Sequence, residues 1–303
     1  MSLSRRTFYE TLGVMRGLSR NSLLTDSVPS SVLHNNQARI LRNGLVISSF
    51  SLVEAYIEDR LEEKIQDLSN SKMPYVTFGD SLRNFLTLDA ITGLNTRMNF
   101  ADKADRLAFA EAGILRAASF QSIPPKYTGL GFSPKGSNIL PADIKSLLSA
   151  FGIKNGWGFL SKVCGNLGAS RISLQDDFQN FFRARNKAAH DSAANTASGD
   201  LETHLGTALL TGMSVDIALT SAIDSFVTER TIATAEDAAN KIPASFRFVD
   251  EQLNGSFLER IGLAGHTIKK HSDRALATKE VLSRRKVLLI VFRDTSSVPT
   301  VLM

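Results

Sequence analysis

The sequence predicts an all-α protein, a bundle of long antiparallel helices followed by a small appendage. Three amphipathic blocks carry this prediction, at about residues 37–68, 173–190 and 201–229. In each block apolar residues recur at spacings of three and four, which is the period of a helix with one buried face. The composition, with 43% hydrophobic and 21% charged residues, is typical of an ordinary folded protein.

The first block predicts one long helix with a single buried stripe. A solvated face of charged residues, including Glu54, Glu58 and Arg60, lies between the apolar positions. The stripe consists of Ile47, Phe50, Val53, Ile57, Leu61, Ile65 and Leu68.

The segment from about residue 69 to 141 has a weaker pattern and is expected to be a loop-rich insertion. Short helices are expected near 82–88 and over 103–120, and residues 122–136 are rich in Pro and Gly and predict a loop. Pro141 is a suitable first residue for a further helix that carries Ile144, Leu147, Leu148 and Phe151.

The last two blocks have recognisable start signals. Ser173-Leu-Gln-Asp176 is a capping pattern for a helix whose apolar face is Phe178, Phe181 and Phe182. A loop of small polar residues at 191–200 follows, and Asp200 is expected to cap a final helix over 201–229. That helix would bury Leu205, Leu209, Met213, Ile217 and Val227.

The pattern therefore divides the chain into three parts. Residues 1–36 form an N-terminal extension, residues 37–232 form the helical domain, and residues 233–303 form a C-terminal appendage. In the appendage Pro243, Phe246, Phe248 and Val249 are irregular or strand-like, 275–282 is helix-like, and 287–292 is rich enough in β-branched and aromatic residues to be a strand. Its fold stays open at this point.

Composition limits the cellular compartments and the kinds of disulfide or metal site that are expected for this chain. One cysteine, Cys164, excludes an internal disulfide framework and a multi-cysteine zinc site, and is expected to be a small buried residue. No secretory signal is visible, and the longest apolar run, 287–292, is too short to span a bilayer, so a soluble cytoplasmic chain without a membrane partner is expected. The net charge of +5 permits a polyanionic partner without requiring one.

Several common catalytic and metal-binding motifs are missing from the chain. There is no Walker-type loop, no Gly-x-Ser-x-Gly and no His-Glu-x-x-His. His266 and His271 enclose two lysines, which repel a cation, so they are expected at the surface or the edge of the core, as are His34 and His204. Neither a metal nor a cofactor is expected.

One six-residue segment combines side chains that act on phosphates: Arg185-Asn186-Lys187-Ala188-Ala189-His190. As a string it has low specificity, because an arginine five residues before a histidine arises easily by chance. Its setting between an amphipathic helix and a second long helix adds weight. Together with segments 49–60 and 174–191, the motif resembles the HEPN superfamily, and within it the bacterial group called RiboL-PSP-HEPN. The resemblance covers about residues 37–230, with a poorly matched middle.

The resemblance implies a homodimer in which two copies of the motif-bearing helix meet at one groove. It further implies a metal-independent endoribonuclease that acts as a toxin or phage-defence effector, with an antitoxin or another defence protein as a partner. HEPN toxins paired with a nucleotidyltransferase antitoxin usually have Tyr two residues after the histidine. Ser192 stands there in this chain, so that subtype is not expected.

Elementary chemistry agrees with such a role. His190, with an ordinary pKa close to neutrality, can exchange protons with a 2′-hydroxyl or a leaving oxygen. Arg185 offers a planar fork to phosphate oxygens, and Asn186, one turn before His190, could orient its ring or bind phosphate. Arg183 and Lys187 would add phosphate contacts at the rim of the RNA-binding site. Residues five apart lie about 140° apart around a helix, so one helix alone does not stack Arg185 on His190.

Two other functions remain open on the sequence. One is a non-catalytic HEPN module that binds RNA or nucleotide or serves only for dimerisation. The other is a helical scaffold in which the motif is incidental, with Arg185 solvated and His190 placed against the negative end of the helix dipole.

Overall fold

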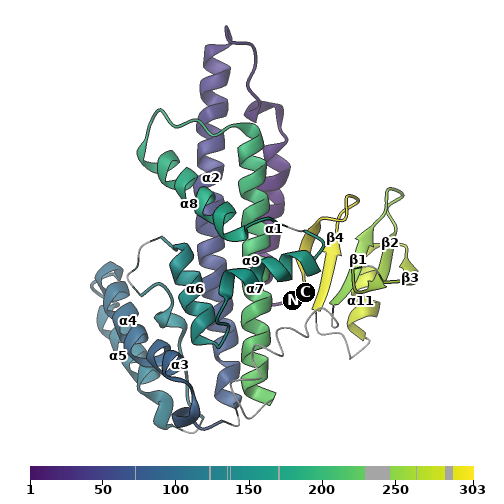
Figure 1. Ribbon diagram of the computed structural model, residues 1–303. Helices are drawn as coiled ribbons and strands as arrows, with labels where there is room; N and C mark the ends of the chain where they lie inside the picture. Colours follow the sequence, from purple (N-terminus) through teal and green to yellow (C-terminus); the bar gives the residue numbers. More distant parts are fainter. Residues whose placement is uncertain are drawn as a thin grey trace. The chain divides into compact units, whose positions relative to one another are not determined.

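The protein is mostly helical and carries a small mixed sheet near its C-terminus (Figure 1). The computed structural model describes residues 1–71, 73–122, 124–134, 136, 138–169, 171–228, 246–263, 265–283 and 289–303. Its helices are α1 (Leu3–Ser19), α2 (Val32–Ile65), α3 (Asp80–Asn84), α4 (Ala90–Phe100), α5 (Arg106–Ala117), α6 (Pro141–Ala150), α7 (Gly156–Asn166), α8 (Leu174–His190), α9 (Ser198–Thr228) and α11 (Arg274–Ser283).

The chain divides into two compact units. Unit 1 comprises Met1–Tyr56, Leu160–Ser214 and Lys241–Met303, and unit 2 comprises Ile57–Phe159 and Val215–Asn240. Helices α2, α7 and α9 contribute residues to both units. The candidate motif and the sheet belong to unit 1.

Aromatic packing holds the helices of unit 1 together. Phe50 of α2 lies against Phe178 and Phe181 of α8, with ring centroids 5.5 and 5.0 Å apart. Phe8 of α1 stacks on Tyr56 of α2 at 4.0 Å. Burying such rings stabilises the fold by about 2 kcal/mol each, so α8 is fixed to α2 through its apolar face.

Unit 2 contains a buried ion pair on the face of α2 that was expected to be solvated. Arg60 is 5% exposed, and its Nη2 lies 2.9 Å from Oδ1 of Asp216 in α9. The expectation of a solvated Arg60 was wrong, because a buried guanidinium is tolerated when a second helix brings a carboxylate to it. Among the described residues of the first predicted stripe, Phe50, Val53, Ile57, Leu61, Ile65 and Leu68 are indeed buried.

The sheet has the strand order β3-β2-β1-β4-β5. Its strands are β1 (Phe246–Glu251), β2 (Phe257–Ile261), β3 (Thr267–His271), β4 (Leu289–Arg293) and β5 (Pro299–Leu302). The pair β1–β4 is parallel and the other pairs are antiparallel. Val249, Ile290 and Phe292 of the sheet pack with Ala277 and Val281 of α11. The C-terminal appendage is therefore an α/β element; Pro243, Val287 and Leu288 lie outside the described residues.

Most helix starts agree with their sequence signals. Pro141 begins α6, and the Ser173 hydroxyl accepts a hydrogen bond from the Asp176 amide at the start of α8. Asp200 does not cap the last helix, because α9 begins at Ser198 and the Leu201 amide already donates to the Ala197 carbonyl at 3.0 Å. Asp200 instead lies in the first turn, where its charge suits the helix dipole.

Two helical stretches are long and apolar enough to cross a bilayer by length and composition alone, Val32–Asn70 and Ser198–Thr228. In the second, 83% of the most apolar window is buried within the protein. Such burial is typical of a core helix in a soluble protein.

Candidate active site

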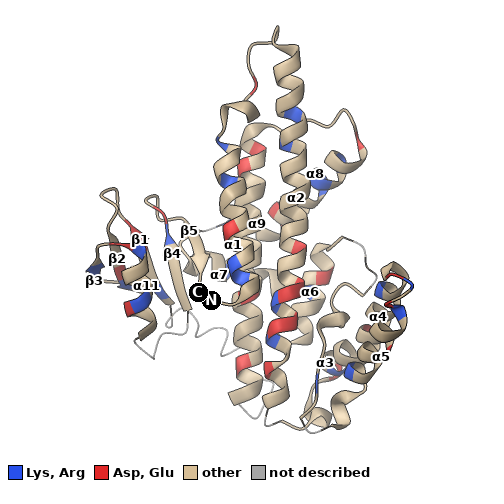
Figure 2. Ribbon diagram, turned by 180° about the vertical axis from the view of Figure 1, so that it is seen from behind, with Lys and Arg blue, Asp and Glu red and all other residues tan. Residues whose placement is uncertain are grey.

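The Arg185–His190 motif forms the last turns of α8. Phe178 and Phe181, earlier on the same helix, are fully buried, and Arg185 lies on their side of α8, seven and four residues after them. Arg183, Lys187 and His190 are exposed, while Arg185 and Asn186 are partly buried. Figure 2 shows the basic positions of α8 in blue. The helix therefore presents Arg183, Lys187 and His190 to solvent, while its apolar face holds it in place.

Arg185 and Asn186 contact each other directly. The Nη1 of Arg185 donates to the Oδ1 of Asn186 at 3.1 Å. The Nε of Arg185 is buried and has no hydrogen-bond partner among the residues that the structure describes. Asn186 thus fixes the guanidinium of Arg185, whereas no hydrogen bond to the His190 ring is present within the same described residues. Arg185 retains donors that can bind an anion.

His190 is the last residue of α8. Its ring makes no hydrogen bond or ion pair with any described residue, and the following residue, Asp191, donates its amide to the Lys187 carbonyl at 2.9 Å. The imidazole is thus accessible to solvent at the C-terminus of the helix. Arg185 and His190 are separated by about 7.5 Å along the helix axis and about 140° around it. Within one chain, therefore, the two side chains do not point to the same place.

The loop that follows His190 is held by three polar residues of α2 that the sequence analysis did not single out. Arg39 donates from Nη1 to the Ser192 carbonyl at 2.5 Å and to the Ala194 carbonyl at 3.3 Å. Asn43 donates to the Ala194 carbonyl at 2.7 Å and accepts from the Thr196 amide at 3.2 Å. We call Arg39, Arg42 and Asn43 the loop clamp.

Arg42 is the centre of the loop clamp and is 0% exposed. Its Nε donates to the Thr196 carbonyl at 2.5 Å and its Nη1 to the Leu24 carbonyl at 2.6 Å. Its Nη2 reaches Asn195 at 2.9 Å and Asp26 at 3.0 Å. A buried guanidinium with this many partners joins three segments of the chain. The spacing of Arg39, Arg42 and Asn43, on one helical face, was the available signal.

Two histidines that were expected at the surface or the core edge are buried instead. His271 is 1% exposed, with Nε2 3.2 Å from Glu259. His204 is 9% exposed and stacks on Phe181, with centroids 5.3 Å apart. The expectation was wrong because each ring found a partner, a carboxylate for His271 and an aromatic ring for His204. Cys164 is buried as expected, and burial raises the pKa of its thiol to about 11.

Burial lowers the pKa of His204 from its ordinary value of 6.5, although Asp200 and Asp177 oppose the shift. The unfolded chain therefore takes up this proton at a higher pH than the folded chain. We expect this contribution to stability to be present above about pH 6.5 and to be lost as the pH falls through the lowered pKa. His204→Phe keeps the ring contact with Phe181 and should reduce the fall in unfolding free energy between about pH 7 and pH 5. Urea denaturation at several pH values measures the free energy of unfolding. An equal change of this free energy with pH in the variant and the wild type would contradict the assignment.

No group of His, Cys, Asp and Glu that could hold a metal ion is present in the described part of the chain. Glu58, on the charged face of α2, pairs with Arg97 of α4 at 3.2 Å. Burial raises the pKa of Glu58, and Arg97 lowers it in part. Glu58 thus forms an ion pair within unit 2.

The helical frame and the motif at the end of α8 agree with the resemblance to HEPN proteins that the sequence shows. The model of the RiboL-PSP-HEPN family matches residues 17–211, which is more than half of the chain, so the protein belongs to this family. The match includes the whole motif and the loop clamp, and it leaves the sheet outside. Comparison with curated proteins and with solved structures gave no match. HEPN domains are often ribonucleases, so the family is consistent with an RNase or RNA-binding role.

Proposed function

We propose that this protein is a metal-independent endoribonuclease of the HEPN type, whose composite site takes Arg185 and His190 from two chains. The observation that carries the proposal is the arrangement of the end of α8. An accessible imidazole, His190, and a partly buried guanidinium, oriented by Asn186, lie on a helix that Phe178 and Phe181 anchor. The loop clamp supports the proposal further, because it fixes the backbone directly after His190.

The proposed reaction is an attack by the 2′-hydroxyl of RNA on the adjacent phosphorus. One His190 accepts the proton of the 2′-hydroxyl while the bond between O2′ and phosphorus forms. The bond between phosphorus and O5′ breaks, and His190 of the partner subunit, protonated, gives its proton to O5′. The two arginines stabilise the negative charge on the pentacoordinate phosphorus. The products are a 2′,3′-cyclic phosphate and a 5′-hydroxyl.

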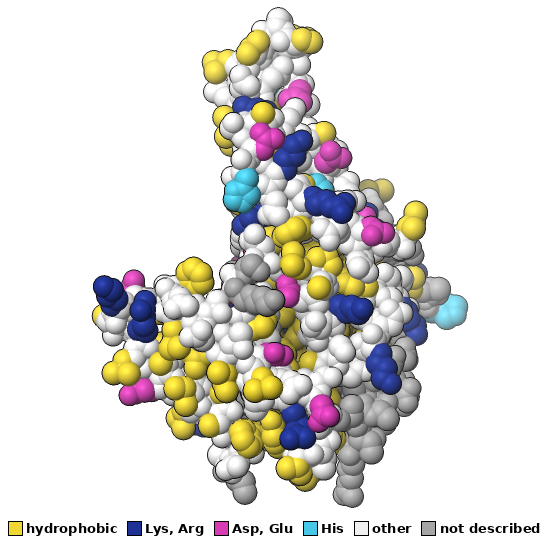
Figure 3. All heavy atoms as spheres, turned by 60° about the vertical axis from the view of Figure 1, so that its left-hand side comes forward, with side chains coloured by type: hydrophobic (Ala, Val, Ile, Leu, Met, Phe, Trp, Pro, Cys, Tyr) yellow, Lys and Arg dark blue, Asp and Glu magenta, His cyan; other side chains and the backbone are white. Residues whose placement is uncertain are grey.

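A second chain is proposed because this reaction requires one base and one acid, and each chain has a single motif histidine. Apolar side chains on the same unit offer contact area for such a dimer. Figure 3 shows exposed hydrophobic side chains in yellow, and the end of α2 nearest the loop clamp carries several of them. They are Val32 (63% exposed), Leu33 (74%), Ile40 (62%) and Leu41 (46%). These four exposed side chains offer apolar contact area to a partner chain.

Purified protein should cleave single-stranded RNA in the presence of EDTA. The same oligonucleotide with 2′-deoxyribose at the cleaved position serves as the matched control and should stay intact, because it lacks the nucleophile. Products should carry 2′,3′-cyclic phosphate ends. RNA binding without any cleavage would favour the alternative, a non-catalytic HEPN module that binds RNA or nucleotide or serves as a dimerisation scaffold.

Arg183 and Lys187 are proposed to contact RNA phosphates through charge alone. Arg183→Gln combined with Lys187→Gln should reduce the slope of log affinity against log salt by about 1.4, since each phosphate contact on single strands contributes about 0.7. Lys103→Gln with Arg106→Gln, two exposed residues at and before the start of α5, removes the same charge and is the control. Fluorescence anisotropy at several salt concentrations measures the slope. An unchanged slope in the first variant would remove Arg183 and Lys187 from the RNA site.

We further propose that the enzyme acts in the cytoplasm as a toxin or a phage-defence effector, held in check by an antitoxin or a defence-system partner. Expression of the wild type should then arrest growth, and His190→Ala should restore it at equal protein level. Normal growth with wild-type protein at that level would contradict the toxin role.

A further inference from the structure

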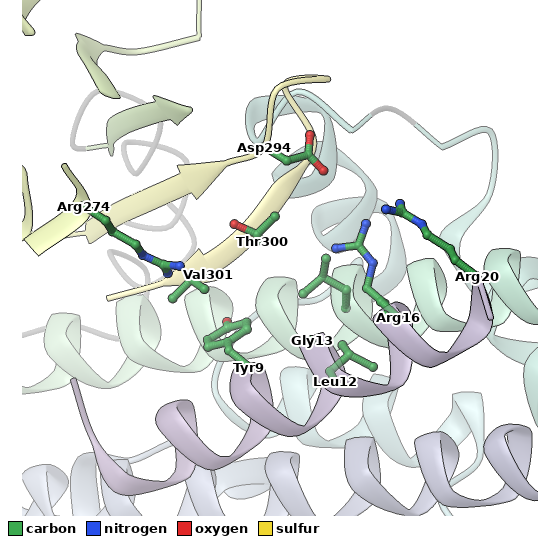
Figure 4. A pocket seen from close by; sticks show the side chains of 11 residues that line it. Tyr9, Leu12, Gly13, Arg16, Arg20, Arg274, Asp294, Thr300 and Val301 are labelled. Atoms are coloured by element: carbon green, nitrogen blue, oxygen red, sulfur yellow. The ribbon is translucent and has the colours of Figure 1, made fainter. Parts of the chain in front are cut away.

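A second site lies in unit 1, away from α8. A cavity of about 340 Å³ is lined by α1, by Leu209 of α9, by Arg274 of α11 and by residues after β4 and on β5 (Figure 4). None of its lining residues belongs to α8 or to the loop clamp. Most of its lining residues also lie outside residues 17–211, the region that the HEPN family model matches. The cavity is thus a feature of this chain beyond its family domain.

Three arginines and a single carboxylate, Asp294, line the cavity. Arg16 and Arg20 are four residues apart on α1, and in Figure 4 both side chains extend into the same space below Asp294. Their guanidinium groups form no hydrogen bond or ion pair with any residue in the described ranges. Arg274 enters from the other side, with its guanidinium carbon 4.7 Å from the centre of the Phe292 ring, and it also interacts with the charge of Glu251. Arg16 and Arg20 therefore bring positive charge to the cavity that no acidic residue of the described ranges pairs with.

Asp294 is committed to its own turn rather than to these arginines. Its Oδ1 accepts hydrogen bonds from the amides of Ser296 at 2.9 Å and Val298 at 3.0 Å. Within the described chain it forms no ion pair with Arg16, Arg20 or Arg274. The arginine forks consequently remain open to an external anion, and planar, bidentate recognition of phosphate is the chemistry that guanidinium groups favour.

The rest of the wall is small or apolar. A Cβ atom placed at Gly13 or Gly17 would meet no atom within 4 Å, so a ligand can approach the backbone of α1 at these positions. Tyr9, Leu12 and Val301 form an apolar surface beside the arginines. The Tyr9 ring is held edge-on against Phe8 at 5.1 Å. One side of the cavity thus suits an anion and the other suits a flat apolar group.

We propose that this cavity binds a small phosphorylated ligand of mononucleotide size, with its phosphate on Arg16 and Arg20 and its apolar part against Tyr9 and Val301. The volume lies at the lower end of the usual range for small-molecule sites, about 300–1,000 Å³. The Thr300 hydroxyl, which donates to the Phe292 carbonyl at 3.1 Å, retains acceptor capacity toward a ligand hydroxyl. This site is independent of the proposed RNA cleavage.

Isothermal titration of the full-length protein with AMP, GMP, CMP and UMP tests the proposal. At least one of the four should bind, and the matching nucleoside, which lacks the phosphate, should bind at least about tenfold more weakly. Arg16→Gln with Arg20→Gln should weaken binding by at least about tenfold as well. Arg6 is exposed on the same helix and does not line the cavity. Arg6→Gln therefore removes one positive charge as a control and should leave binding unchanged.

Two more variants separate this site from misfolding and from the RNA site. Gly17→Leu fills the cavity without changing charge and raises helix propensity, so it should abolish binding in a protein that is at least as stable as the wild type. Arg185→Ala with His190→Ala should bind the nucleotide normally. Absence of binding to all four nucleotides, binding that survives Gly17→Leu, or binding lost only in the Arg185 and His190 variant would overturn the proposal.

Discussion

Replacing His190 by alanine is expected to lower the rate of RNA cleavage by about 10² to 10⁴-fold, the usual contribution of a general acid or base. The expected loss is large because the variant removes the proton acceptor and the proton donor of the proposed dimer together. His190 is exposed and makes no contact with described residues, so the fold should be unaffected. Single-turnover cleavage of a labelled RNA in EDTA measures the loss.

Arg185→Ala should lower cleavage by about 10² to 10³-fold, since it removes charge stabilisation at the phosphorus. Asn186→Ala should have a smaller effect, because Asn186 acts through Arg185 by the 3.1 Å hydrogen bond. His266→Ala and Arg106→Ala remove an exposed histidine and an exposed arginine outside the motif and serve as matched controls. Equal losses in the control variants, or none in the motif variants, would contradict the assignment.

Replacing Arg42 by methionine is expected to lower the free energy of unfolding by about 2–4 kcal/mol. The variant removes the side-chain donor to the Thr196 carbonyl and leaves the Leu24 carbonyl with the Ser198 hydroxyl, at 3.2 Å, as its remaining side-chain donor. We also expect slower RNA cleavage, because the clamped loop continues directly from His190. Urea denaturation and the cleavage assay measure the two effects on the same preparation.

Arg39→Met is the matched control for Arg42. Arg39 holds the same loop but is partly exposed, so water can replace its hydrogen bonds and the expected loss is only about 1 kcal/mol. Arg42→Lys retains the charge and loses the fork, and it should be intermediate between Arg42→Met and the wild type. Equal stability of Arg42→Met and Arg39→Met would show that the buried guanidinium does not hold the loop.

Helices with a regular apolar period could be predicted from the sequence with little error. The stripe from Phe50 to Leu68 is buried, and the start signals at Pro141 and Ser173 operate as local chemistry predicts. Asp200 was a poorer guide, because Ser198 and Gly199 adopt helical backbone although serine and glycine both have low helix propensity. Periodicity places a helix well, and its ends depend on competing local hydrogen bonds.

Contacts between distant segments were beyond the reach of local patterns. Arg42 and Thr196 are separated by 154 residues, and Arg60 and Asp216 by 156. A charged residue on an amphipathic helix has no local mark that tells whether a partner will reach it, so Arg60 was expected to be solvated and Arg42 was not singled out. Residue types indicated strands near 246–249 and 287–292, but they could not show that these strands pair in one sheet, since β1 and β4 are far apart in the sequence.

The candidate site was only half visible in the sequence. Arg185 to His190 could be found from residue types and from the helices around it, and the structure adds the contact of Arg185 with Asn186 and the clamp on the following loop. The angular separation of Arg185 and His190 could also be predicted, because it follows from helix geometry. What brings two motifs together depends on a second chain, which a single sequence does not contain.

Mixed dimers test the central claim, that two chains build one cleavage site from Arg185 and His190. Differently tagged wild-type and His190→Ala chains are co-expressed, and the heterodimer is isolated and assayed on RNA in EDTA beside both homodimers. The account predicts activity in the wild-type homodimer and almost none in the heterodimer, because the base and the acid come from different chains. A heterodimer with about half of the wild-type rate would contradict it, since each chain would then carry a complete site.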